Sequence, residues 1–143
     1  MFIGEYEHNL DTKGRMAIPV KFREKLNNGA IITRGLDSCL FVFDPRAWET
    51  LAQKLVNLPL AQANSRAFAR LMLAGAMEVN VDSQGRILVP DYLRRYAGLD
   101  KEVVVAGLYN RIELWDASKW QNYKAETEAS SNNIAEKMSE LGI

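Results

Sequence analysis

Two aspartate–arginine pairs at the same spacing are the residues of this chain best suited to chemistry. Asp11 and Arg15 bracket the segment Asp-Thr-Lys-Gly-Arg, and Asp82 and Arg86 bracket Asp-Ser-Gln-Gly-Arg. A carboxylate can orient a guanidinium for bidentate contact with guanine or phosphate. The alternative is an ion pair that ties two strands together, which at a surface stabilises by only about 0–1 kcal/mol. A tight turn needs Gly, Asn or Asp but no Arg, which favours the binding interpretation.

Each pair belongs to a longer motif that occurs twice. Gly14 and Gly85 can supply the positive φ of a tight turn at no steric cost. Apolar residues follow each turn and indicate a strand. Pro19 and Pro90 are expected to end that strand and to take the first position of a short helix. The sequence therefore predicts the order strand, turn, strand, short helix, strand, strand, helix in each half.

Apolar periodicity and capping signals predict the elements around the turns. Alternation places Met16, Ile18 and Val20 on one buried face of a strand. Asp44 and Asp116 are expected to cap helices. Other strands are predicted within residues 1–10, 30–34, 39–43 and 76–81, and other helices over 21–26, 45–58 and 60–74. The polar tail after the last helix is expected to be partly disordered.

Neither copy of the motif is large enough to fold alone. A unit of about 45 residues can hardly bury enough apolar surface for independent stability. Two such units must share a core, most simply around a pseudo-two-fold axis, with hairpins from each half covering the strand edges of the other. The predicted fold class is α+β, mainly β with helices. The alternative is that the duplication serves stability alone and the turns are connectors.

Charge is balanced over the whole chain but clustered locally. Lys+Arg 18 equals Asp+Glu 18, which argues against coating nucleic acid by overall charge. Lys13 in the first turn stands where Gln84 stands in the second, so the first copy is expected to contribute more to binding. The candidate DNA contacts are Lys13, Arg15, Lys21, Arg23, Arg86 and Arg94.

Few residues suit catalysis or metal binding. His8 is the only histidine, which excludes a histidine triad or a multi-histidine metal site. Cys39 lies in an apolar strand pattern and is expected to be a small buried hydrophobe. No phosphate-cradling glycine run occurs. We therefore expect no enzyme, no cofactor and no metal. No apolar run approaches the roughly 18 residues of a membrane span, and a cytoplasmic protein is expected.

The two Asp-x-x-x-Arg turns, the strands that end in Ile-Pro and Val-Pro, and the helical stretch between the copies resemble the MraZ family. These are bacterial transcriptional regulators of the cell-division and cell-wall gene cluster. The resemblance covers the chain from Met1 to about Trp120. It implies a tandem pair of swapped-hairpin, AbrB-like β-barrel units. The expected SpoVT-AbrB-like repeats span residues 5–47 and 76–119, with a helical insert at 48–75 and a C-terminal helix and tail at 120–143.

The resemblance also implies a function. Chains would assemble into a homo-oligomeric ring that binds double-stranded DNA at short direct repeats upstream of its own operon, as a nucleoid-associated repressor. It links Arg15 and Arg86 to DNA binding, with Asp11 and Asp82 as orienting carboxylates. Two alternatives stay open. One is an antitoxin-like protein-interaction module, and the other is a structural ring that does not bind DNA.

Overall fold

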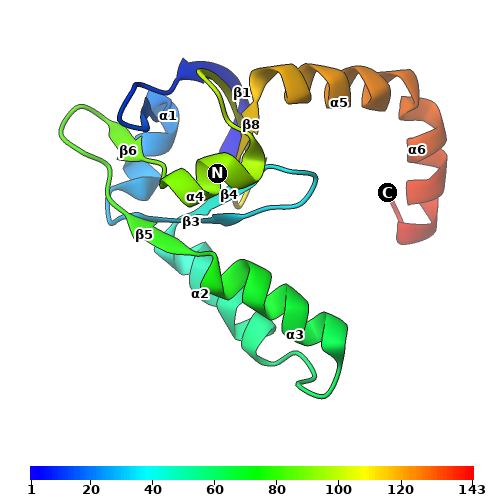
Figure 1. Ribbon diagram of the computed structural model, residues 1–143. Coiled ribbons are helices and arrows are strands. Elements are labelled where there is room, and N and C mark those ends of the chain that lie inside the picture. The colour runs from blue at the N-terminus through cyan, green and yellow to red at the C-terminus, as the bar shows by residue number, and fades with distance from the viewer.

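Two antiparallel sheets organise the chain, of which a computed structural model describes residues 1–143 (Figure 1). The larger sheet has six strands in the order β1 (Phe2–Asn9), β7 (Glu102–Tyr109), β8 (Ile112–Asp116), β4 (Leu40–Phe43), β3 (Ala30–Arg34) and β5 (Met77–Val79). The smaller sheet is a two-stranded ribbon of β2 (Arg15–Ala17) and β6 (Arg86–Leu88). The fold class is α+β, as predicted.

The two halves of the chain exchange strands. β2 pairs with β6, β1 pairs with β7, and β5 pairs with β3, so each of these pairings joins the first half to the second. In the ribbon, Met16 faces Ile87, and each arginine faces the residue two positions beyond the other arginine. This reciprocal register is the local signature of a pseudo-two-fold axis, and it agrees with the predicted tandem arrangement.

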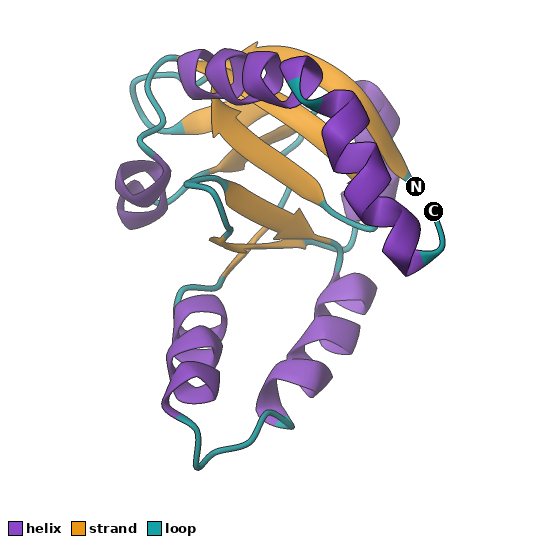
Figure 2. Cartoon of the chain, turned by 90° about the vertical axis from the view of Figure 1, so that its right-hand side faces the viewer, coloured by secondary structure: helices purple, strands orange, loops and turns teal.

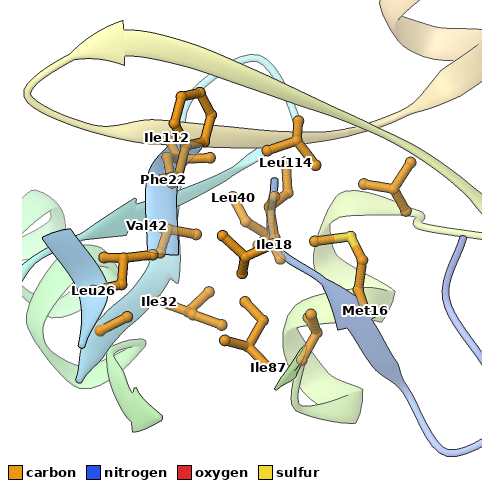
Figure 3. Packing of buried hydrophobic residues seen from close by; sticks show 14 of the residues in the cluster. Met16, Ile18, Phe22, Leu26, Ile32, Leu40, Val42, Ile87, Ile112 and Leu114 are labelled. Atoms are coloured by element: carbon orange, nitrogen blue, oxygen red, sulfur yellow. The ribbon is translucent and has the colours of Figure 1, made fainter. Parts of the chain in front are cut away.

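One hydrophobic core of 18 buried residues draws on both halves (Figure 3). Met16 and Ile18 from the first half meet their counterparts Ile87 and Val89, and each of the four is 1% exposed or less. Val20 was expected on the same face but is 74% exposed. The strand ends at Ala17, so the alternation does not extend to Val20, which begins helix α1 (Val20–Arg23).

A short helix follows each ribbon strand. α1 continues into a 3₁₀ turn, η1 (Glu24–Leu26), and the matching helix in the second half is α4 (Asp91–Ala97). Both prolines occupy the N-cap position, not the first helical position that we predicted. Their ψ angles of 136° and 146° keep them extended, so the helix begins one residue later. Phe22 and Leu26 are buried.

A helical hairpin connects the two halves in sequence and projects away from the sheets (Figures 1 and 2). It contains α2 (Pro45–Val56), α3 (Ala63–Ala69) and a π-helical turn η2 (Arg70–Ala74). Asp44 caps α2 as predicted, accepting a hydrogen bond from the Ala47 amide at 2.7 Å. The second helix begins at Ala63, later than expected, because the three residues after Pro59 form a turn closed by the Gln62 amide.

The C-terminal region is helical throughout most of its length. α5 (Ala117–Ala129), capped by Asp116, is followed by α6 (Ser131–Met138) and a 3₁₀ turn η3 (Ser139–Leu141). The expected partial disorder of the tail is therefore wrong, and the structure breaks the helix only at Ser130. Neither α5 nor α6 has a fully buried residue. No helix of the chain is long and apolar enough to cross a membrane.

Candidate nucleic-acid interface

The first Asp–Arg turn is closed by the side chain of Asp11. Its Oδ1 accepts hydrogen bonds from the backbone amides of Lys13 and Arg15, both at 2.9 Å. Its Oδ2 accepts from Arg15 Nε at 2.7 Å. The backbone closes the same loop, because the Asp11 amide donates to the Arg15 carbonyl and the Gly14 amide donates to the Asp11 carbonyl. One carboxylate therefore fixes both the turn and the arginine.

The second turn repeats this bonding atom for atom. Asp82 Oδ1 accepts from the amides of Gln84 and Arg86 at 2.9 Å, and Oδ2 accepts from Arg86 Nε at 2.9 Å. Gly14 and Gly85 both have positive φ, at +83° and +77°. A residue with a Cβ would be strained at either position.

The arginines keep most of their hydrogen-bonding capacity. Only Nε of each guanidinium is bonded within the protein, so the two terminal nitrogens of Arg15 and of Arg86 have no protein partner. Their side chains are 34% and 29% exposed. Each ion pair lies inside one turn at i, i+4 spacing, and β1 does not pair with β2. Each ion pair therefore closes its own turn and does not bridge two paired strands.

Both arginines lie on the same face of the β2–β6 ribbon. Side chains alternate along a strand. Met16 and Ile87 face the core, so Arg15 and Ala17 on β2, and Arg86 on β6, lie on the outer face. Leu88 shares this face and is 51% exposed. Ala17 and Leu88 were not among the predicted contacts, although they share the parity of the arginines along each strand.

Hydrogen bonds hold both turn carboxyls in their ionised form. The amide of Arg15 is the largest cause that lowers the pKa of Asp11, to about 2, and the Arg15 side chain and the Lys13 amide add to it. The pKa of Asp82 is lowered in the same way, first by the Arg86 amide. Donors directed at a carboxylate favour its charged form. Both turns therefore carry an ionised Asp beside a cationic Arg at neutral pH.

We expect an NMR titration of the Asp11 carboxyl carbon to give a midpoint of about 2. Because its folded pKa is depressed, the ionised turn stabilises the fold above the usual pKa of 3.8, and this contribution is lost as the pH falls toward 2. Arg15→Ala should leave the pKa below 3.8, since the backbone amide stays. A midpoint near 3.8 in the unaltered protein would show that the turn is open in solution.

The other predicted contacts fall into two groups. Lys13 in the first turn and Lys21 on α1 are exposed. Arg23 and Arg94 are half-buried and lie against the turns. Because the two halves exchange strands, Arg23 lies against Gly85 of the second turn and Arg94 lies against Gly14 of the first. Each arginine therefore contacts the turn of the opposite half.

Residues typical of metal or nucleophile sites do not gather here. No group of three or more His, Cys, Asp or Glu side chains is placed to hold a metal ion. Cys39 is buried, and burial is the main cause that raises its pKa to about 12. The pKa of His8 is lowered by burial and then by the charge of Arg23. The arrangement is suited to binding an anionic ligand through guanidinium groups.

Comparison with known proteins matches the whole chain to one family. The family model described as "MraZ protein, putative antitoxin-like" matches twice, over residues 1–71 and 72–141. Proteins called "Transcriptional regulator MraZ" from Acetivibrio thermocellus and Clostridium acetobutylicum are each 52% identical over 143 residues, covering all of both chains. The protein of that name from Desulforamulus reducens is 49% identical over 141 residues, or 99% of each chain. These names describe a regulator, not an enzyme.

Proposed function

Because the chain belongs to the MraZ family, we propose that it is a transcriptional regulator that binds double-stranded DNA through its two Asp–Arg turns. One observation carries this proposal. The chain builds the same turn twice, and each turn fixes an arginine by Nε while leaving the two terminal nitrogens unpaired. A guanidinium held in this way presents the planar fork that recognises guanine or phosphate.

The shape of the ribbon suits a DNA groove. A two-stranded antiparallel ribbon fits the major groove, where an arginine can donate two hydrogen bonds to one guanine. Arg15 and Arg86 lie on its outer face, and the opposite face is held by the core. Lys13 in the first turn and Lys21 on α1 are exposed, and we propose that both contact phosphates. We propose that the first turn binds more strongly, because the second has Gln84 in place of Lys13.

Assembly would add avidity to weak single contacts. Within one chain the units at 5–47 and 76–119 would act as a built-in dimer. Unlike surfaces on the two halves favour head-to-tail contacts between chains, and such contacts close into a ring when the rotation permits. A ring that presents several turns gains affinity for sites that recur along the DNA. We propose repression through short direct repeats upstream of its own cell-division and cell-wall operon.

One feature supports the antitoxin-like alternative. The arm formed by α5 and α6 has no fully buried residue. Ile134, Met138 and Leu141 on it are exposed at helical spacing. Such a stripe could bind a partner protein. In that case the arginine turns would not be needed for binding, and the experiment below separates the two functions.

The test is DNA binding by Arg15→Ala and Arg86→Ala with DNA from upstream of the gene. A good bidentate contact contributes about 1–3 kcal/mol, so each variant should bind about 5- to 150-fold more weakly. The larger loss is expected for Arg15→Ala. Light scattering should show the same oligomer as the unaltered protein, because neither arginine bonds beyond its own turn. Arg46→Ala, an exposed arginine of α2, is the matched control.

Unchanged affinity in both variants would contradict the assignment of the binding turns. Loss of the oligomer would show instead that the arginines hold chains together. The unaltered protein should also bind more weakly as salt rises, because phosphate contacts release counterions.

A further inference from the structure

Each turn glycine is covered by an arginine of the opposite half. A Cβ built on Gly14 would lie 2.7 Å from Arg94 Cζ and 3.0 Å from its Nε. A Cβ on Gly85 would collide with Arg23 Cζ and lie 2.5 Å from its Nε. The guanidinium planes therefore occupy the space that any other residue would fill with a side chain.

Backbone hydrogen bonds join the same elements. The Ile18 amide donates to the Gly85 carbonyl at 2.8 Å, and the Val89 amide donates to the Gly14 carbonyl at 2.9 Å. The Ile18 carbonyl in turn accepts from Arg23 Nε at 2.8 Å. Ile18 thus holds the second turn directly through its amide and indirectly through Arg23.

The two contacts differ in strength. Arg23 has a hydrogen bond that fixes its Nε. Arg94 Nε is buried without a partner. The ion pair of Arg94 with Asp91 is long, because its Nη2 lies 3.7 Å from Asp91 Oδ1. A buried donor without a partner has lost its hydration with no hydrogen bond in return. The first turn, under Arg94, is therefore held less firmly than the second turn, under Arg23.

We propose that Arg23 and Arg94 are positioning residues, each of which holds the DNA-binding turn of the opposite half in place, and that they do not contact phosphate. This inference rests on the proposed DNA-binding function. It links the two binding turns, because the helix that follows one ribbon strand supports the turn that precedes the other.

Crossed double-mutant cycles on the full chain test the pairing without DNA. Gly85→Ala should raise the unfolding equilibrium constant in the unaltered background, partly by strain at φ +77° and partly by collision with Arg23. In Arg23→Ala the collision is absent, so the effect of Gly85→Ala should be smaller by about tenfold. In Arg94→Ala it should be unchanged. Gly14→Ala should show the opposite pattern, with coupling to Arg94 only.

Urea unfolding at one fixed protein concentration gives these constants. Equal coupling of Gly85 to both arginines, or coupling to neither, would overturn the proposal. Amide resonances give a second readout, since Arg23→Ala should shift the Gly85 amide and leave the Gly14 amide in place. A shift confined to Gly14 would contradict the structure.

The salt dependence of DNA binding separates positioning from phosphate contact. Arg23→Ala should weaken binding while the slope of log affinity against log salt stays the same. Lys21→Ala, on the same helix but exposed, is the comparison, and its slope should fall by about 1 per bound chain. The same fall for Arg23→Ala would overturn the proposal. If the unaltered protein binds no DNA, the proposed function fails, whereas the crossed cycles still decide whether the arginines hold the turns.

Discussion

Phe22→Ala is expected to lower the free energy of unfolding by about 3–5 kcal/mol, the cost typical of removing a buried aromatic ring. Phe22 is 2% exposed. Its ring packs edge-on against Phe2 and Tyr6, with centroids 5.2 and 5.3 Å apart. These contacts connect β1 to α1, so the cavity would lie where the first strand meets the helix that carries Arg23. Urea denaturation measures the loss.

Phe68→Ala on α3 is the matched control for this prediction. Phe68 is 37% exposed and belongs to the projecting hairpin, so its replacement should cost less than about 1 kcal/mol. Equal losses for the two variants would contradict the central place of Phe22 in the shared core. Weaker DNA binding by Phe22→Ala, under conditions in which this variant stays folded, would be consistent with the positioning role of Arg23.

Gly107→Ala is the second change expected to have a large effect. In β7, Gly107 faces Gly4 of β1, and an added Cβ would lie 2.5 Å from the Ile3 nitrogen and 2.6 Å from the Phe2 carbonyl carbon. Both are backbone atoms, so neither can move aside without separating β1 from β7. We expect a loss of about 1–3 kcal/mol, the range for overpacking.

Hydrogen exchange shows whether this loss is local. Amides of β1 should exchange faster in Gly107→Ala, because the added methyl group separates the two strands, whereas amides of β3 and β4 should change less. Leu108→Ala is the control, since Leu108 is the next residue in the strand and is 39% exposed. Unchanged protection of β1 would show that the strands tolerate the methyl group.

The sequence alone determined the local parts of the site. Each Asp–Arg turn closes through bonds that span no more than four residues, so its aspartate, glycine and arginine can be recognised by spacing. The caps at Asp44 and Asp116 are local in the same way. The duplication also predicted a shared core, because neither half has enough apolar residues to bury. Local rules failed at Val20, where the strand ends before the alternation does, and in the tail, where a polar sequence forms a helix.

Only the tertiary structure decided which half supports which turn. Alternation assigns a strand residue to a face, but it does not identify the partner strand, and the pairing of β2 with β6 joins segments far apart in the chain. That pairing places Arg15 and Arg86 on one outer face. It also places Arg23 of the first half against the second turn, and Arg94 of the second half against the first turn. The physical reason is that contact between distant segments depends on how both halves bury one core, and no short stretch of sequence encodes that arrangement.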